Sequence, residues 1–444
     1  AAYQAFIGPA RDNASVSADP SFISSTGGNA GFLRLNPSAN CSLIGKGVNV
    51  FLLQQDVDLE NRMTQSPLIC DIGADEVGKL NIWTGAVSNL WNADGNWSAG
   101  IAANATDARV LIPSGTPFAP RIQVGETFQV KDLYLQAGAS LQNLGTIQAG
   151  SVIQVPGAGQ INHIESGIVQ GSIELINACN EPWVIDGAAW VNNSVKNLLA
   201  GTNASIPVAT ASRVQVAGTL SFGGLTGKTL TTNNNLVLLS SANATAGIAD
   251  ITGNIINGQV TVERFINTGT TGGAHPKTWQ FLSAPTAGQS IFQSWQENGS
   301  AAPGFGTWIT GTGTGFDATS SLPSLKKYNP ASNLWNGETS TLNPVNNGNG
   351  YMLFVRGDRT VTTVSGSPVP TILRSKGTVY QPNNPPPDII VGAGQRASVG
   401  NPYPSAIDVE YMRDNGFFSN LNNDVVVWDP MLFGSFGYGG YQTL

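Results

Sequence analysis

The sequence predicts an all-β chain, in which a parallel β-helix or β-solenoid is followed by a β-sandwich module. Short alternating apolar segments recur along the chain, each bounded by Gly, Asn or Pro, which is typical of sandwiches, barrels and solenoids. Charged residues are only 11% of the 444 residues, and 53 glycines supply tight turns. A weak helical pattern over 406–415 is the exception.

The strongest strand candidates are alternating or continuously apolar runs. They occur at 110–112, 130–135, 214–222, 236–239, 260–265, 351–355 and 425–428. Their texture divides the chain into three expected domains, 1–78, 79–262 and 263–444. The middle domain is aliphatic and rich in Gly and Asn, with turns about every ten residues, which predicts stacked coils. A long sandwich is the alternative for this stretch. The last domain carries most of the Phe, Tyr and Pro.

The charge and hydropathy patterns argue against nucleic-acid binding and against a membrane span. The formal net charge is −7, and Lys and Arg are scattered singly. Nucleic-acid binding requires a basic stripe to neutralise phosphates, so we expect no nucleic-acid partner. No apolar run of 18 residues is present, so we expect no membrane-spanning segment.

The first domain resembles the closing coils of right-handed parallel β-helices in bacterial surface proteins. The matching motifs, in order, are 19–22 (DPSF), 33–35 (LRL), 42–47 (SLIGKG) and 71–76 (DIGADE). Residues 65–70, which precede the final motif, match the usual sequence of that family less well. The resemblance implies that earlier coils precede Ala1.

The middle domain opens with 83–85 (WTG), Trp91, Trp97 and 110–113 (VLIP). This resembles the start of β-strand-repeat modules in Bacteroidetes proteins that the type IX secretion system exports. We expect the tryptophans to cap or staple the first coil. Sugar binding by these rings is the alternative.

The last domain resembles the C-terminal ectodomain of large type IX cargo proteins, including adhesin-like cell-surface proteins. Its motifs are 260–265 (VTVERF), 277–286 (KTWQFLSAPT), 304–307 (GFGT), 315–319 (GFDAT), 348–359 (GNGYMLFVRGDR), 400–408 (GNPYPSAID) and 428–430 (WDP). Such cargo ends in a small sorting domain, and nothing after 428–430 resembles one. We therefore expect the module to be incomplete and the native chain to continue past Leu444.

Three carboxylates are candidate calcium ligands. Asp56, Asp58 and Glu60 alternate and would share one face of a strand, and hard oxygen ligands suit Ca²⁺. A solvated turn is the alternative. Asp71, Asp75 and Glu76 form a second acidic group, which the resemblance assigns to turn and cap hydrogen bonds. Apart from this structural calcium we expect no cofactor.

Candidate ligand-binding residues are Trp295, Trp308 and Trp335, because carbohydrate modules stack sugars on exposed rings. Core packing is the alternative. We expect no catalytic residues. The chain has two histidines, His163 and His275, and neither lies in a nucleophile motif.

Two smaller features of the sequence also have structural interpretations. The tripeptide 356–358 (RGD) follows a predicted strand, and we expect a structural turn with an Arg–Asp pair instead of an integrin ligand. Of three cysteines, Cys41 and Cys70 share one domain, and their pairing after export is the alternative to buried thiols.

We therefore expect a non-catalytic structural or adhesive segment of a large protein at the surface of a Gram-negative bacterium or outside it. The expected partners are the type IX machinery during export and surface glycans. One alternative is a carbohydrate-binding or polysaccharide-processing protein whose active region lies upstream. Another is a passenger captured with the export machinery.

Overall fold

The computed structural model describes residues 19–36, 43, 47, 55–57, 59, 62, 70–73, 75–106, 108–154, 159–176, 183–270, 274–345, 348–418, 420–422, 424–434 and 437–443. It is all-β, with 6% of residues helical, and contains a parallel β-solenoid of about six turns. The all-β class and the solenoid predicted from the sequence are thereby confirmed. No helix among the described residues is long and apolar enough to span a membrane.

The chain divides into two compact units. Unit 1 comprises Ala1–Trp183, Ala189–Val191 and Gly201–Asn203, and unit 2 comprises Val184–Ala188, Asn192–Ala200 and Ala204–Leu444. The short strand β11 (Trp183–Val184) lies at this division. The boundary expected at 262/263 falls within strand β21 (Val260–Ile266).

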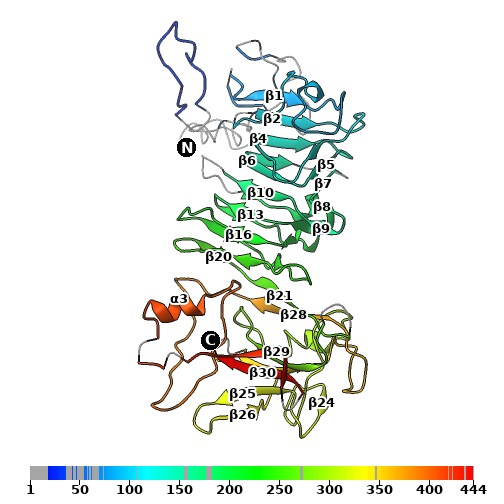
Figure 1. Cartoon of the computed structure of the whole chain (residues 1–444). Coiled ribbons are helices and arrows are strands. Elements are labelled where there is room, and N and C mark those ends of the chain that lie inside the picture. The colour runs from blue at the N-terminus through cyan, green and yellow to red at the C-terminus, as the bar shows by residue number, and fades with distance from the viewer. Residues whose placement is uncertain are drawn as a thin grey trace, which may run out of the picture. The chain divides into compact units, whose positions relative to one another are not determined.

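Unit 1 contains two runs of parallel strands (Figure 1). The first is β1 (Lys79–Ile82), β2 (Ala108–Ile112), β4 (Thr127–Leu135), β6 (Thr146–Gln154) and β10 (Ser172–Leu175). The second is β3 (Arg121–Ile122), β5 (Ser140–Asn143) and β7 (Gln160–Asn162). A small antiparallel pair, β8 (Ile164–Glu165) and β9 (Ile168–Val169), follows.

Like side chains stack from coil to coil in unit 1. Phe128, Ile147 and Ile173 are register neighbours across β4, β6 and β10, and all are buried. A coil of this kind buries its apolar residues only against the next coil, which is why the alternation recurs along the sequence.

Three tryptophans pack together beside β1 and β2, where the sequence predicts that they staple the first coil of the middle domain. Trp83 and Trp91 are completely buried and Trp97 is 3% exposed. The Trp97 ring lies edge-on to both others, with centroids 5.1 and 4.8 Å away. Each indole N–H donates to a backbone carbonyl. No ring face is left for a sugar.

In unit 2 each coil supplies strands to three parallel sheets. One holds β12 (Ser194–Val195), β15 (Val214–Val216), β18 (Leu236–Leu238) and β21; a second holds β13 (Leu198–Ala200), β16 (Thr219–Ser221) and β19 (Gly247–Ile248); the third holds β14 (Ala204–Ser205), β17 (Thr229–Thr231) and β20 (Ile255–Asn257). Val214, Leu236 and Val260 form one fully buried ladder through the first sheet.

The last coil of unit 2 is closed on all three sheets. Strand β28 (Thr371–Gly377) pairs antiparallel with β21. The side-chain amide of Gln381 accepts from the Ile256 N–H and donates to the Ile256 carbonyl of β20, at 2.8 and 3.1 Å. The Pro404 carbonyl accepts from the Ile248 N–H of β19 at 2.9 Å. Unpaired sheet edges invite association with other chains, so this closure gives the solenoid a protected end.

The remainder of unit 2 is built on an antiparallel sheet. Its strands, in order, are β22 (Thr278–Leu282), β27 (Tyr351–Val355), β25 (Leu325–Asn329) and β26 (Leu334–Gly337). One face contributes Leu325, Leu353 and Val355 to a core that also contains Ile266 of β21 and Leu373 of β28. The core therefore joins this sheet to the closing strands of the solenoid.

Smaller elements complete the fold. They are the pair β23 (Thr310–Gly311) and β24 (Ala318–Thr319), the hairpin β29 (Val426–Gly434) and β30 (Gly437–Thr443), helix α3 (Val409–Asp414), and the 3₁₀ helices η1 (Asp94–Asn96), η2 (Gly187–Ala189), η3 (Val191–Asn193), η4 (Thr210–Ser212) and η5 (Glu297–Gly299). Helix α3 lies where the sequence has its weak helical pattern. Its first turn is capped by the Asp408 carboxylate, which accepts from the Tyr411 N–H.

Candidate functional site

The predicted calcium ligands are only partly described. Asp56 is 8% exposed, and its carboxylate accepts from the Glu76 N–H at 3.2 Å. Asp58 and Glu60 lie outside the described residues. Within the described part of the chain, no group of three His, Cys, Asp or Glu side chains is placed to hold a metal ion. The calcium site therefore remains a prediction.

The second acidic group belongs to a buried charge cluster in unit 1, here called the Arg109 network and defined as Asp71, Glu76, Arg109 and Asp132. The Arg109 guanidinium lies 2.7 Å from Asp132, 3.1 Å from Glu76 and 3.5 Å from Asp71. Its side chain is fully buried, and its three partners are 3% exposed or less. Arg109 and Asp132 are direct register neighbours on β2 and β4.

Turn hydrogen bonds tie the DIGADE motif into this network. The Asp71 carboxylate accepts from the Val77 N–H at 2.6 Å, and the Glu76 carboxylate accepts from the Asp71 N–H at 3.2 Å. The Asp75 carboxylate accepts from the Leu35 N–H at 2.8 Å. These bonds confirm the structural role that the sequence assigns to the motif.

Burial and charge act together on the pKa values here. Burial, followed by the Asp71 charge, raises the pKa of Glu76. Burial acts to lower the pKa of Arg109, but the carboxylates of Asp132 and Asp71 outweigh it and raise that pKa above its usual value. Burial, followed by the Asp132 charge, raises the pKa of Tyr134 to about 12. The cluster is a closed structural element, and solvent does not reach it.

A buried histidine lies elsewhere in unit 1. The Nδ1 atom of His163 is 3.3 Å from the Asn143 side-chain nitrogen, and its ring meets Trp190 edge-on at 5.6 Å. Its Nε2 atom has no hydrogen-bond partner among the described residues. Burial lowers the pKa of His163 to about 4. The imidazole is therefore neutral at pH 7.

The three predicted glycan-binding tryptophans lie in different surroundings. Trp295 is 3% exposed and belongs to the core, edge-on to Tyr351 at 5.7 Å, so its ring faces no solvent. Trp308 is half-buried, with the Arg359 guanidinium 5.2 Å from its ring centroid. Core packing thus accounts for Trp295, and a cation already occupies one face of Trp308.

Trp335 belongs to an aromatic cluster of unit 2. Its ring lies 5.0 Å from Phe281 and 5.3 Å from Tyr328, and its indole N–H donates to the Tyr441 hydroxyl at 3.1 Å. Trp428 belongs to the same cluster, because its ring centroid lies 5.0 Å from that of Tyr441. Side chains alternate across a strand, so Tyr328 lies on the opposite face from the core residue Leu325. Trp335 is half-buried, and Tyr441 is 50% exposed.

The tripeptide 356–358 is buried. Arg356 is 6% exposed and Asp358 is 7% exposed. The expected Arg356–Asp358 pair is wrong, because the Arg356 guanidinium donates to the Trp308 carbonyl at 2.6 Å. Asp358 instead accepts from the Gly304 N–H at 2.7 Å, so both side chains hold neighbouring loops. Cys70 is buried as well, and Cys41 lies outside the described residues.

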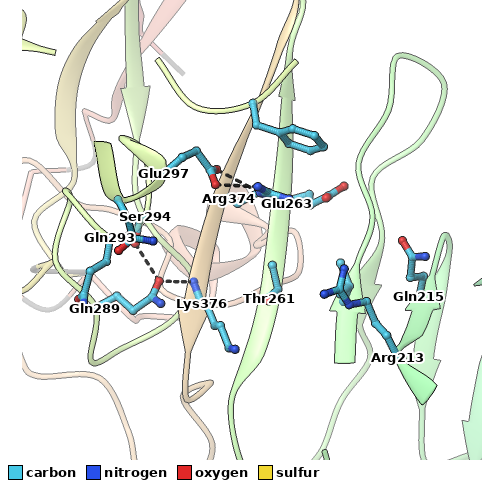
Figure 2. Close-up of a pocket in the computed structure, with 13 residues that line it drawn as sticks. Arg213, Gln215, Thr261, Glu263, Gln289, Gln293, Ser294, Glu297, Arg374 and Lys376 are labelled. Atoms are coloured by element: carbon cyan, nitrogen blue, oxygen red, sulfur yellow. Dashed lines mark hydrogen bonds and ion pairs between the residues drawn. The ribbon is translucent and has the colours of Figure 1, made fainter. Parts of the chain in front are cut away.

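A polar pocket in unit 2 was not predicted from the sequence. It is a pocket of about 320 Å³ beside β21 and β28, here called the β21–β28 pocket (Figure 2). It is lined by Arg213, Gln215, Val237, Thr261, Glu263, Gln289, Gln293, Ser294, Glu297, Asn298, Phe305, Arg374 and Lys376.

The floor of the pocket is one register row. Gln215, Val237, Thr261 and Lys376 are successive neighbours across β15, β18, β21 and β28. The sequence predicts strands at β15, β18 and β21 but none at β28. It does not give their register, because residues up to 161 positions apart meet only when the coils stack and β28 pairs with β21.

One wall contains an ion pair. The Arg374 guanidinium donates to both carboxylate oxygens of Glu297, at 3.0 and 2.6 Å, and stacks on the Phe305 ring at 3.9 Å from its centroid (Figure 2). The Gln289 side-chain oxygen accepts from the Lys376 N–H at 2.6 Å and from the Ser294 hydroxyl at 3.0 Å. The wall is therefore organised before any ligand arrives.

The other charges of the pocket are less satisfied. Glu263 is 8% exposed, its carboxylate accepts from the Ser240 N–H at 3.2 Å, and burial raises its pKa. Arg213 and Lys376 have no side-chain hydrogen bond or ion pair among the described residues. Arg213 is exposed and Lys376 is half-buried, so solvent reaches both of these pocket cations.

A second hollow of similar size lies beside the closed end of the solenoid and is more apolar. Tyr380, Pro382, Tyr403 and Pro404 contribute to its lining. It is formed by the segments that cover β19 and β20, so closure of the solenoid accounts for it.

No protein-family model, curated protein or solved structure matches this chain.

Proposed function

We propose that this chain is a non-catalytic structural and adhesive segment of a large protein that the type IX system exports to the surface of a Gram-negative bacterium. The order of motifs described above supports the export route. A solenoid extends by about 4.8 Å per coil, so it suits the display of a binding surface at a distance.

The observation that carries the proposal is the closed last coil. Backbone and side-chain groups from β28, Gln381 and Pro404 cover the edges of β21, β20 and β19. A spacer in a crowded extracellular setting must not pair with other strands, and this closure prevents such pairing.

We further propose that the region after β21 is a β-sandwich module. The antiparallel sheet β22-β27-β25-β26 has one core face and one aromatic face. Leu373 and Ile266 pack against the core face, and the Trp428 indole N–H donates to the Trp279 carbonyl beside the aromatic face, at 2.8 Å. Layers on both faces of a sheet support this assignment.

Binding without turnover is supported by the carboxylates of the β21–β28 pocket. Hydrolysis of a glycosidic bond uses a pair of carboxylates, of which one acts as nucleophile or base. Both oxygens of Glu297 are engaged by Arg374. Glu297 is therefore not available for either role beside Glu263.

Protease treatment of intact cells tests the location. The chain is detected with an antibody in the source bacterium and in a matched strain without the type IX translocon. We expect surface digestion in the first strain and intracellular retention in the second. Surface digestion in both strains, or in neither, would rule out this export route.

A turnover assay tests the absence of catalysis. The purified 444-residue chain is incubated with a panel of polysaccharides, and reducing ends and unsaturated uronates are measured. No product above the buffer control is expected. Product formation that Glu263→Gln abolishes would replace the adhesive proposal by an enzymatic one.

A further inference from the structure

We propose that the β21–β28 pocket binds a carboxylated sugar, such as a uronic acid unit of an acidic glycan. This inference rests on the adhesive function proposed above and names the ligand class of that site. Three features carry it: an elongated floor, two solvent-accessible cations without an ion pair in the described residues, and walls of amide and hydroxyl groups.

The floor suits an extended ligand. Gln215, Val237, Thr261 and Lys376 follow one another across four strands, each about 4.8 Å from the next. The Val237 position is apolar, and amide and hydroxyl groups flank it. Sugar rings combine an apolar C–H face with polar edges, so this alternation matches their chemistry.

The charge of the pocket selects an anion. Among its three cations, Arg374 is engaged by Glu297 and stacked on Phe305. Arg213 and Lys376 make no side-chain hydrogen bond or ion pair within the described residues, although the Arg213 charge acts on Glu263. Glu263 is nearly buried and already accepts a backbone N–H. A guanidinium binds a carboxylate through two parallel hydrogen bonds, which makes Arg213 the natural anchor.

The remaining walls favour a sugar over a bare anion. Gln289, Gln293, Ser294 and Asn298 line one side. Amide and hydroxyl groups both donate and accept hydrogen bonds, as the hydroxyls of a sugar require. The side-chain oxygens of Gln289 and Gln293 already accept hydrogen bonds from protein donors. The Ser294 hydroxyl and the Asn298 amide still supply acceptors, which an inorganic anion cannot use because it only accepts hydrogen bonds. The overall net charge of −7 disfavours general attraction of anions, so the local cations must act.

Calorimetry with the full 444-residue chain tests the proposal. The probes are trigalacturonic acid, its methyl ester and maltotriose, and inorganic phosphate is tested separately. We expect the acid to bind, and the ester and the neutral sugar to bind roughly tenfold more weakly or not at all. Binding of the acid should weaken as ionic strength rises.

Variants assign the binding to the pocket. R213Q and K376Q should each weaken binding of the acid roughly tenfold, and K376R should retain it. R264Q is the matched control, because Arg264 lies on the same strand β21, is exposed and does not line the pocket. Unchanged thermal midpoints show that the variants are folded.

Three results would overturn the inference. The first is equal binding of the acid and its ester; the second is unchanged affinity of the R213Q/K376Q double variant; the third is phosphate binding as tight as that of the acid, which indicates a general anion site. None of these affects the surface-digestion experiment. If digestion succeeds and no glycan binds, the chain is a spacer, and the ligand inference alone has failed.

Discussion

The Arg109 network of unit 1 and the β21–β28 pocket of unit 2 are built from the same kinds of side chain with opposite outcomes. In the network every charge is buried, and Arg109 meets three carboxylates. In the pocket, Arg374 and Glu297 form an ion pair, and Arg213 and Lys376 form none among the described residues. Buried charges that contact one another connect parts of the structure, whereas accessible charges without an ion-pair partner are available to a ligand.

The largest expected effect tests the structural side of this contrast. Arg109→Met removes the guanidinium that lies against the buried carboxylates of Asp132, Asp71 and Glu76, of which Glu76 keeps only a longer contact to Arg62 at 3.8 Å. It should lower the free energy of unfolding by about 3–5 kcal/mol. Denaturant titration measures it. The control is Arg121→Gln, which breaks the Arg121–Glu165 pair, whose side chains are 31% and 35% exposed, and should cost about 0–1 kcal/mol. Equal effects of the two variants would contradict the role assigned to the network.

His163 offers a test by pH. Its folded-state pKa of about 4 lies below the usual 6.5, so its contribution to stability is present above pH 6.5 and is lost as pH falls toward 4. Full loss amounts to about 3 kcal/mol. His163→Gln should flatten the dependence of the unfolding free energy on pH between 6.5 and 4. An unchanged slope in the variant would show that other groups cause the acid sensitivity.

Closure of the solenoid predicts a smaller effect. Gln381→Ala leaves the N–H and carbonyl of Ile256 unpaired and should cost about 1–3 kcal/mol. The exposed edge of β20 should also promote self-association, measured by light scattering. Gln395→Ala, at an exposed position, is the control. If the Gln381→Ala variant stays monomeric and its stability is unchanged, Gln381 does not help to close the solenoid.

The smallest expected effect concerns the open cations. R213Q and K376Q should change the free energy of unfolding by less than about 0.5 kcal/mol, because neither side chain is paired among the described residues. Thermal and denaturant unfolding measure it. A loss comparable to that of Arg109→Met would mean that these cations stabilise the fold, and the contrast between the two clusters would then break down.

The sequence by itself determined the all-β class and the stacked coils, because alternation and turn residues are local signals. It also placed the tryptophan staple and the structural role of the DIGADE motif. It did not separate buried from exposed rings, so Trp295 was proposed for a ligand although it lies in the core.

Only the tertiary structure decided the rest. The Arg109–Asp132 pair and the row from Gln215 to Lys376 depend on strand register, which no local pattern specifies. Arg356 donates to the Trp308 carbonyl, which the fold brings close from a distant part of the sequence. The sequence does not show whether a charged residue has an ion-pair partner or is accessible to a ligand. Its partners come from distant coils, and they decide whether it holds the fold or faces a ligand.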